Sequence, residues 1–207
     1  MKLEICTGDI ASVRAAAAGG ADRVELCSAL GEGGLTPSIG LIKEARKVPG
    51  LRLHVLIRPR EGDFVYDADE VACMAADIRA ARDAGADGVV IGALTAGGDI
   101  DLDVCRRLIC EAEGMSVTFH RAFDRCRDPF RALEEIVSLG CDRLLTSGQA
   151  ASAYYGIDLL RQLVEHSAGR ISIMAGAGVT PGNVAEIVTA TGVDEVHASA
   201  RVTIAVE

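Results

Sequence analysis

Tryptophan is absent from this 207-residue chain, and aromatic residues make up only 3% of it. A core must therefore be built mainly from Ala, Val, Leu and Ile, which fall within a hydrophobic content of 49%. The 23 glycines divide the chain into short segments. This composition favours layered helices and strands over a β-sandwich, and the length suits one well-buried core. We expect a single domain over residues 1–207.

The chain also lacks an excess of basic residues and any long apolar run. It has 21 Lys and Arg against 30 Asp and Glu, a net charge of -9, so its surface repels polyanions. The longest stretch without a charged residue, 171–185, has 15 residues, fewer than the ~20 that a membrane-spanning helix needs. We expect no nucleic-acid partner and no membrane partner. Residues 1–4 lack the basic start of a signal peptide, which favours a cytoplasmic location.

No CxxC pair or zinc-finger spacing occurs among the cysteines, whose odd number argues against a disulfide framework. A metal site would have to combine residues that are distant in sequence. We expect reduced thiols at all seven positions: Cys6, Cys27, Cys73, Cys105, Cys110, Cys126 and Cys141.

A Gly-x-Asp motif recurs along the chain. It occurs four times, 65, 55 and 52 residues apart. Each copy follows a helical pattern, where glycine supplies a left-handed helix end, and each precedes a short run of β-forming residues. Every copy therefore predicts a helix leading into a strand. The four copies begin at Gly20, Gly85, Gly140 and Gly192.

Further β-forming runs lie between these repeats, which gives eight short strands alternating with helices. This order predicts an α/β fold, a closed (β/α)8 TIM-type barrel. An open dinucleotide-binding sheet is disfavoured because no GxGxxG follows the first strand. Asp128-Pro129 and Thr180-Pro181 are expected to begin helices. Only residues 201–207 follow the last strand, so we expect no full eighth helix and expect another subunit to cover that edge. The expected strands are 3–6, 23–27, 51–57, 88–92, 115–119, 143–146, 171–174 and 195–198.

Polar residues inside these strands are the candidates for chemistry, because helices cover the outer face and alternate residues point into the barrel. Buried charges need partners, and paired groups near a barrel mouth have shifted pKa values. For Glu4 and Glu25 the alternative is a salt bridge at the barrel floor. The inward set is Glu4, Cys6, Glu25, Cys27, His54, Arg58, Thr118, His120, Glu195, His197 and Ser199.

A titratable base next to a fixed cation at the end of the fifth strand, His120-Arg121, is the sharpest local signal. An enzyme would use Glu25 or His120 as acid or base, with His197 as a further candidate, and Arg58 and Arg121 to orient an anionic substrate. The alternatives are a satisfied core histidine and a solvated loop of mixed charge. We expect further anion contacts from Arg60, Ser147, Gly176, Gly178 and Ser199.

Five segments together resemble one family. They are Glu25-Leu26-Cys27 leading to Ser38, then Ile57 to Phe64, Val117 to Asp124, Leu145 to Gly148 and Met174 to Val179. In this respect the chain is similar to the CutC copper homeostasis proteins over essentially its whole length. The resemblance implies a (β/α)8 barrel, a cytosolic compartment, copper handling and homo-oligomers. Members usually continue beyond the Ser-Ala-Arg that follows the eighth strand, so contacts of that tail are not carried over.

For copper, the resemblance points to Cys27 in the Glu-Leu-Cys motif and to Cys6 at the matching offset on the neighbouring strand. Thiolates suit Cu(I), although a buried cysteine also serves as a small hydrophobe. Two other functions stay open at this point. One is a barrel enzyme that uses Glu/His acid-base chemistry on a small anionic metabolite, and the other is a non-catalytic ligand sensor.

Overall fold

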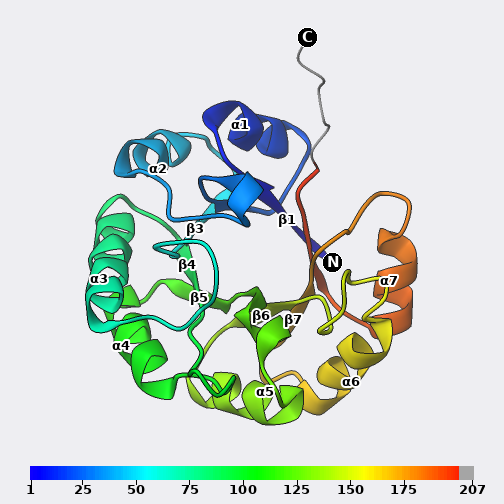
Figure 1. Ribbon diagram of the computed structural model, residues 1–207. Helices are drawn as coiled ribbons and strands as arrows, with labels where there is room; N and C mark the ends of the chain where they lie inside the picture. Colours follow the sequence, from blue (N-terminus) through cyan, green and yellow to red (C-terminus); the bar gives the residue numbers. More distant parts are fainter. Residues whose placement is uncertain (201–207) are drawn as a thin grey trace.

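The computed structural model describes residues 1–200 and shows a closed barrel of eight strands, each hydrogen-bonded to its sequence neighbours in parallel (Figure 1). The expected strands are confirmed to within one residue at their ends. They are β1 (Lys2–Thr7), β2 (Arg23–Leu26), β3 (Arg52–Leu56), β4 (Gly88–Ile91), β5 (Ser116–Phe119), β6 (Arg143–Thr146), β7 (Ser172–Ala175) and β8 (Glu195–Ala198).

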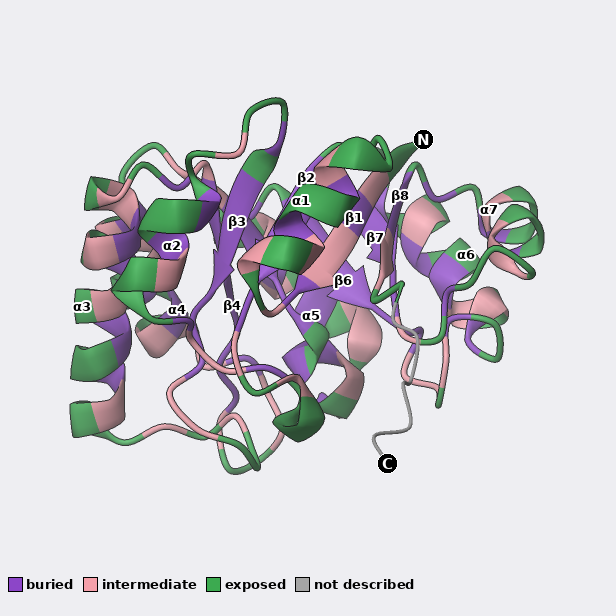
Figure 2. Ribbon diagram, turned by 90° about the horizontal axis from the view of Figure 1, so that it is seen from above, coloured by how far each residue is buried: buried purple, intermediate pink, exposed green. Residues whose placement is uncertain are grey.

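In the described part of the chain, seven α-helices surround the barrel and two short 3-10 helices follow β2 and β5. Most strand residues are buried and the outward helix faces are exposed, whereas β1 is largely of intermediate burial (Figure 2). The TIM-type prediction is therefore confirmed, whereas the expected lack of an eighth helix concerns residues 201–207, outside the described residues. The helices are α1 (Ile10–Ala18), η1 (Leu30–Glu32), α2 (Ile39–Ala45), α3 (Ala68–Asp83), α4 (Leu102–Ala112), η2 (Arg121–Arg125), α5 (Pro129–Ser138), α6 (Ile157–Ser167) and α7 (Val184–Thr191).

The Gly-x-Asp repeats end helices as expected, and their aspartates also bind neighbouring strands. All four glycines have positive φ, between +74° and +84°, as a left-handed helix end requires. Three of the aspartates also accept a hydrogen bond from the backbone of the preceding odd-numbered strand. The repeat thus ties successive strands together at the amino end of the barrel. The pairs are Leu3 N to Asp22 at 2.8 Å, Leu53 N to Asp87 at 2.8 Å and Val117 N to Asp142 at 2.7 Å.

One of the two expected helix starts is wrong. The Asp128 side chain accepts from the N–H groups of Phe130 and Arg131, with Pro129 as the first helical residue, as predicted. Thr180, in contrast, begins no helix, since α7 starts only at Val184. Asn183 accepts from the Thr180 N–H at 2.8 Å and so closes a turn before the helix. The Thr180 carbonyl oxygen accepts from the Val184 N–H at 3.0 Å, so residues 181–183 form a turn that leads into α7.

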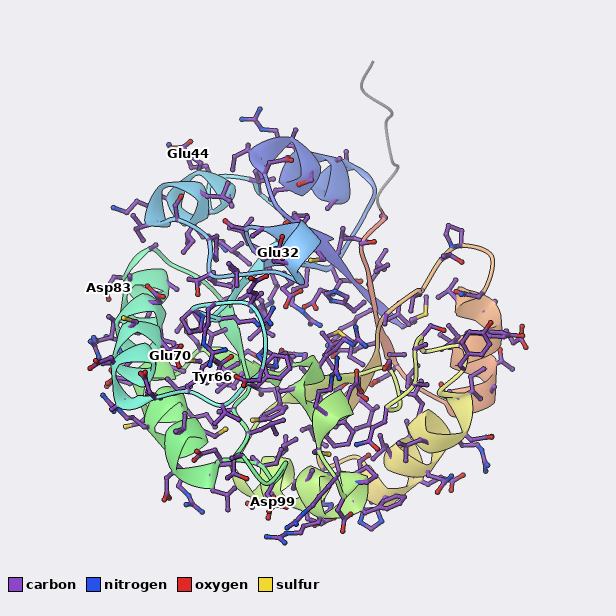
Figure 3. The ribbon with its side chains drawn as sticks, in the orientation of Figure 1. Glu32, Glu44, Tyr66, Glu70, Asp83 and Asp99 are labelled. Atoms are coloured by element: carbon purple, nitrogen blue, oxygen red, sulfur yellow. The ribbon has the colours of Figure 1, made fainter. Side chains whose placement is uncertain are left out.

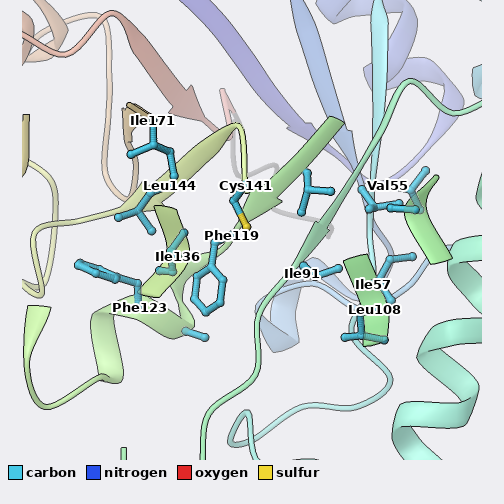
Figure 4. Close-up of a cluster of buried hydrophobic side chains, with 14 of the residues drawn as sticks. Val55, Ile57, Ile91, Leu108, Phe119, Phe123, Ile136, Cys141, Leu144 and Ile171 are labelled. Atoms are coloured by element: carbon cyan, nitrogen blue, oxygen red, sulfur yellow. The ribbon is translucent and has the colours of Figure 1, made fainter. Parts of the chain in front are cut away.

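The large hydrophobic core lies between the barrel and its helices, where Val55, Ile91, Phe119 and Leu144 pack with helix residues such as Ile136 (Figure 4). A smaller cluster inside the barrel contains Cys27, Leu56 and Val90, with Cys6 and Leu30 packed against it. Alternation along the strands separates the two clusters. Because the inner cluster is small, polar groups fill much of the remaining interior.

An apolar pocket of about 440 Å³ lies along the edge between β1, α1 and the end of β8. Covering of this edge by a second copy of the chain stays a prediction. This pocket is lined mainly by Leu3, Ile5, Cys6, Ala15, Ala16, Ala21, Leu30 and Ala200.

None of the described helices combines the length and the apolarity needed to cross a bilayer.

Candidate metal and ligand site

The floor of the barrel is a buried ion-pair network. Arg23, Arg143 and Glu195 are the first residues of their strands, and both arginines donate to Glu195, at 2.5 and 3.3 Å. Arg23 also donates to Glu4, the third residue of β1. The salt-bridge alternative thus describes the contact of Glu4 with Arg23, but Glu4 has a second partner above it.

That partner is His197, which stands between two carboxylates. Its Nδ1 lies 2.7 Å from Glu4 Oε1 and its Nε2 lies 3.6 Å from Glu25 Oε2. Burial alone would lower the His197 pKa, but hydrogen bonds with Cys6 and Glu4 and the charges of Glu25 and Glu4 raise it well above its ordinary value. Burial alone would raise the Glu4 pKa, yet the hydrogen bond and charge of His197 and the charge of Arg23 lower it to about 2.

Glu25 differs from Glu4 although the two carboxylates flank one imidazole. Burial, together with the negative charge of Glu4, raises the Glu25 pKa, while the charge of His197 opposes the shift. Two carboxyl groups whose pKa values move in opposite directions have different protonation tendencies, which is typical of acid-base sites. The arrangement therefore offers a charged histidine beside a carboxyl group that gains a proton more readily.

Two thiols meet beside this histidine. The Sγ atoms of Cys6 and Cys27 are 3.5 Å apart, and the Cys27 thiol also lies 3.5 Å from the Thr7 carbonyl oxygen. Ligand atoms of Cys6, Glu25 and His197 lie within 4.8 Å of one another. The hydrogen bond with Cys27, burial and the charge of Glu25 all raise the Cys6 pKa. Cys6 therefore belongs to both a dithiol pair and a Cys/Glu/His group.

A pocket of about 340 Å³ opens above these groups at the carboxyl ends of the strands. It is where ligands bind in barrels of this architecture. Its wall joins polar side chains to an apolar lining, and the chain segments after β2, β3, β5, β7 and β8 all contribute. The lining includes Cys6, Glu25, Leu30, Leu56, Arg58, Phe64, His120, Arg121, Leu145, Gly178, Val179, His197 and Ser199.

Arg58 is placed at this pocket as predicted, but much of its guanidinium is already engaged. It donates to the carbonyl oxygens of Glu32, Gly34 and Gly62, each at 3.1 Å. Its Cζ lies 5.0 Å from the centre of the Phe64 ring. Arg58 therefore ties the loops after β2 and β3 together as well as lining the pocket.

His120 also lines the pocket, but the nitrogen that could accept a proton is already hydrogen-bonded. Its Nδ1 accepts the Ala122 N–H at 3.1 Å, so the neutral ring carries its proton on Nε2, which has no hydrogen-bond partner within residues 1–200. Burial and the nearby charge of Arg58 lower the His120 pKa to about 3. At neutral pH the geometry suits a hydrogen-bond donor, while an acid-base role for His120 stays a prediction.

Arg121 reaches the pocket wall, where Asp124 pairs with its Nε at 2.8 Å. Asp124 also accepts from Thr146 Oγ1 at 2.5 Å and from Ser147 Oγ at 2.9 Å. Sequence reasoning missed this function of Asp124, although Asp124 closes the motif that begins with Val117. Its position five residues after the end of the fifth strand could have suggested a clamp between neighbouring loops.

The predicted anion contacts divide into two groups. Gly178 and Ser199 line the pocket, whereas Arg60, Ser147 and Gly176 are not among its lining residues. Arg60 pairs with Glu70, beside Tyr66 at the start of α3 (Figure 3). Ser147 is fully buried against Asp124, and Gly176 packs on Leu145 and His197.

Together, the closed parallel barrel and the polar groups gathered at its strand ends define a (β/α)8 protein with a ligand-accessible mouth. Comparison with known proteins narrows this class. The model of the CutC family matches residues 1–202. CutC family proteins of Bacteroides thetaiotaomicron and Vibrio cholerae are each 55% identical to the chain, over 97% and 98% of its length and 81% and 80% of theirs. The chain belongs to the CutC family.

Solved structures agree with this assignment. A CutC protein from Streptococcus agalactiae, to which a role in copper homeostasis is ascribed, superposes with a TM-score of 0.93 at 35% identity. That comparison covers 96% of this chain and 98% of the other. A structure described as the aldolase QR15 superposes with a TM-score of 0.73 at 14% identity, covering 96% of this chain and 89% of the other. At that identity the likeness concerns the fold alone.

Proposed function

We propose that this protein binds Cu(I) as a cytoplasmic copper-handling protein, through the thiolates of Cys6 and Cys27. The observation that carries the proposal is the 3.5 Å separation of the two Sγ atoms at the carboxyl ends of adjacent strands. Thiolate sulfur is the soft donor that Cu(I) prefers. In this proposal copper is the ion that the protein handles, and the two cysteine side chains are its ligands.

The surroundings of the two thiols differ in a way that suits capture of an ion. Cys27 is fully buried and packs with Leu56 and Val90, whereas Cys6 is only partly buried and lines the mouth pocket. An ion arriving through the pocket meets Cys6 first and Cys27 behind it. His197 and Glu25, whose ligand atoms lie within 4.8 Å of Cys6 Sγ, are further donors beside this thiol.

Binding requires that the thiols lose their protons. The raised Cys6 pKa means that this thiol is protonated at neutral pH without a metal. The cost of removing that proton favours a strongly thiophilic ion over harder divalent cations, which compete less well for sulfur. The donor set therefore fits Cu(I) better than Mg²⁺ or Ca²⁺.

A competitive titration tests the proposal. The reduced full-length protein is titrated with Cu(I) against a chromophoric Cu(I) chelator, in parallel with Cys6→Ser and Cys27→Ser. Cys105→Ser is the matched control, since Cys105 is a buried thiol elsewhere in the core. We expect each site variant to lose at least tenfold in affinity and the control to keep it. Unchanged affinity in both site variants would reject the site.

A second candidate function rests on a different observation, the placement of His197 between Glu4 and Glu25 at the same pocket. A charged imidazole beside a carboxyl group of raised pKa is suited to proton transfer. In this alternative, the protein is an enzyme that acts on a small anionic metabolite. Turnover that is abolished by His197→Asn in metal-free protein would favour the enzyme over copper handling.

A further inference from the structure

Three arginines are buried in the described part of the chain, and their partners differ. Arg23 and Arg143 both donate to the Glu195 carboxylate. Arg58 is 7% exposed, yet no carboxylate oxygen within residues 1–200 lies within ion-pair distance of it. Its hydrogen bonds go to three backbone carbonyls, which carry no formal charge. A buried cation without a counter-charge costs free energy of folding. A bound anion would supply the counter-charge that Arg58 lacks among the described residues.

A second group at the same pocket lacks an acceptor. His120 is 5% exposed, and its Nε2–H makes no hydrogen bond within the described residues. Buried side-chain donors without a partner are rare in folded proteins, and each calls for an explanation such as a ligand. His120 cannot turn this nitrogen away easily, since its Nδ1 is held by the Ala122 N–H.

The two groups flank one aromatic ring. The Phe64 ring centre lies 5.0 Å from the Arg58 Cζ and 5.0 Å from the centre of the His120 ring. All three side chains line the 340 Å³ pocket. Arg121 and His197 line it too, but Asp124 pairs with Arg121, and Glu4 and Glu25 flank His197. Among the described cations of this pocket, Arg58 is therefore the one without a carboxylate partner, and His120 adds a neutral donor.

We propose that this pocket binds a small monocarboxylate, held by the charge of Arg58 and by the Nε2–H of His120. One negative charge matches the one unpaired guanidinium, whereas a phosphate dianion would bring a second charge with no partner. Leu30, Leu56 and Leu145 give the same pocket an apolar part of its wall. It suits a short aliphatic body. The volume is at the small end of the range for ligand pockets.

This binding site goes beyond copper handling, because neither Arg58 nor His120 belongs to the thiol pair. It also needs no catalytic step. The test therefore measures carboxylate binding in metal-free protein and in its Cys6→Ser variant. Carboxylate binding can then succeed or fail independently of Cu(I) binding.

The experiment is a calorimetric titration at fixed ionic strength with aliphatic monocarboxylates of two to six carbons. Each acid is paired with its neutral amide, and inorganic phosphate is a further probe. We expect at least one carboxylate to bind saturably and at least tenfold more tightly than its amide and than phosphate, since a charge-assisted bond is worth about a factor of ten or more. Equal binding of acid and amide, preference for phosphate, or no binding of any acid would overturn the proposal.

Two variants locate the site. His120→Phe keeps a ring but removes the donor, and Arg58→Gln removes the charge. The matched control is Arg60→Gln, because Arg60 lies two residues from Arg58 but pairs with Glu70. We expect both site variants to lose at least tenfold in carboxylate affinity and the control to change less than twofold. If Arg58→Gln fails to fold, His120→Phe decides alone, and wild-type affinity in that variant contradicts the proposal.

Discussion

The Nδ1 atom of His197 lies 2.7 Å from Oε1 of Glu4, a part-buried contact that joins the floor of the barrel to its mouth. Glu4 holds Arg23 through its other oxygen. His197 faces Glu25 with its second nitrogen. One carboxylate thus fixes both the ion pairs below and the imidazole orientation above, where Cys6 and the ligand pocket lie.

Glu4→Gln removes the charge that faces both His197 and Arg23. We expect the free energy of unfolding to fall by about 3 to 5 kcal/mol, as when one partner of a buried ion pair is lost. Urea unfolding at pH 7 measures this change. Glu134→Gln is the matched control, because Glu134 pairs with Arg170 at the exposed surface and should be nearly neutral. Equal stability of the two variants would contradict this account.

Stability should fall as the pH drops from 6 to 4.5. Burial and the charge of Arg58 lower the pKa of His120 to about 3. Burial lowers the pKa of His54 to about 4. In this window the unfolded chain binds protons at both histidines and the folded chain does not, so unfolding is favoured by about 1.4 kcal/mol per pH unit for each. Urea unfolding across the window gives the slope.

A single substitution tests which histidine carries that slope. His120→Gln should reduce the pH dependence by one histidine's share while the far-UV spectrum stays native. The matched control is His166→Gln, which changes a half-exposed histidine on α6 in the same way. If His120→Gln shows the full wild-type slope, the buried neutral state assigned to His120 is wrong.

Cu(I) affinity should rise with pH. The Cys6 thiol has a raised pKa because of its hydrogen bond with Cys27, its burial and the charge of Glu25. Each thiol proton that copper displaces makes the apparent affinity increase up to tenfold per pH unit below the thiol pKa. Competitive titrations at pH 6, 7 and 8 measure this dependence. Affinity that stays constant over this range would mean that the ion displaces no thiol proton.

Gly92 keeps the space that His120 occupies. A Cβ at this position would lie 2.6 Å from both Cε1 and Nδ1 of the imidazole. Gly92→Ala should therefore displace His120, cost about 1 to 3 kcal/mol of stability as overpacking does, and weaken carboxylate binding. Gly31→Ala is the control, since nothing lies within 4 Å of a Cβ there. Equal thermal stability of the two variants would argue against this packing.

The barrel could be predicted from the sequence because its signals are local and repeated. Gly20 and its three counterparts mark helix ends, and the two-residue alternation in Leu3-Glu4-Ile5-Cys6 assigns the inward face. The turn at 181–183 that precedes α7 was not predicted, since Pro181 suits the second position of a turn as well as the first position of a helix.

The site could be predicted in its membership but not in its connections. Parity placed Cys6, Cys27, Glu25 and His197 inside the barrel, and the structure brings them together. That Arg58 would bond to three carbonyls depends on how two loops cross, which no local pattern encodes. Pairing between distant residues is a tertiary property, so sequence reasoning supplied the side chains and not their partners.

Copper K-edge X-ray absorption of the Cu(I)-loaded protein tests the central claim most directly, because it identifies the atoms bound to the metal. Binding through Cys6 and Cys27 predicts two sulfur scatterers at one equivalent of copper. Cys27→Ser should lose one of them, whereas Cys105→Ser should keep both. A first shell of nitrogen and oxygen alone, or two sulfurs that persist in both Cys6→Ser and Cys27→Ser, would contradict the dithiol site.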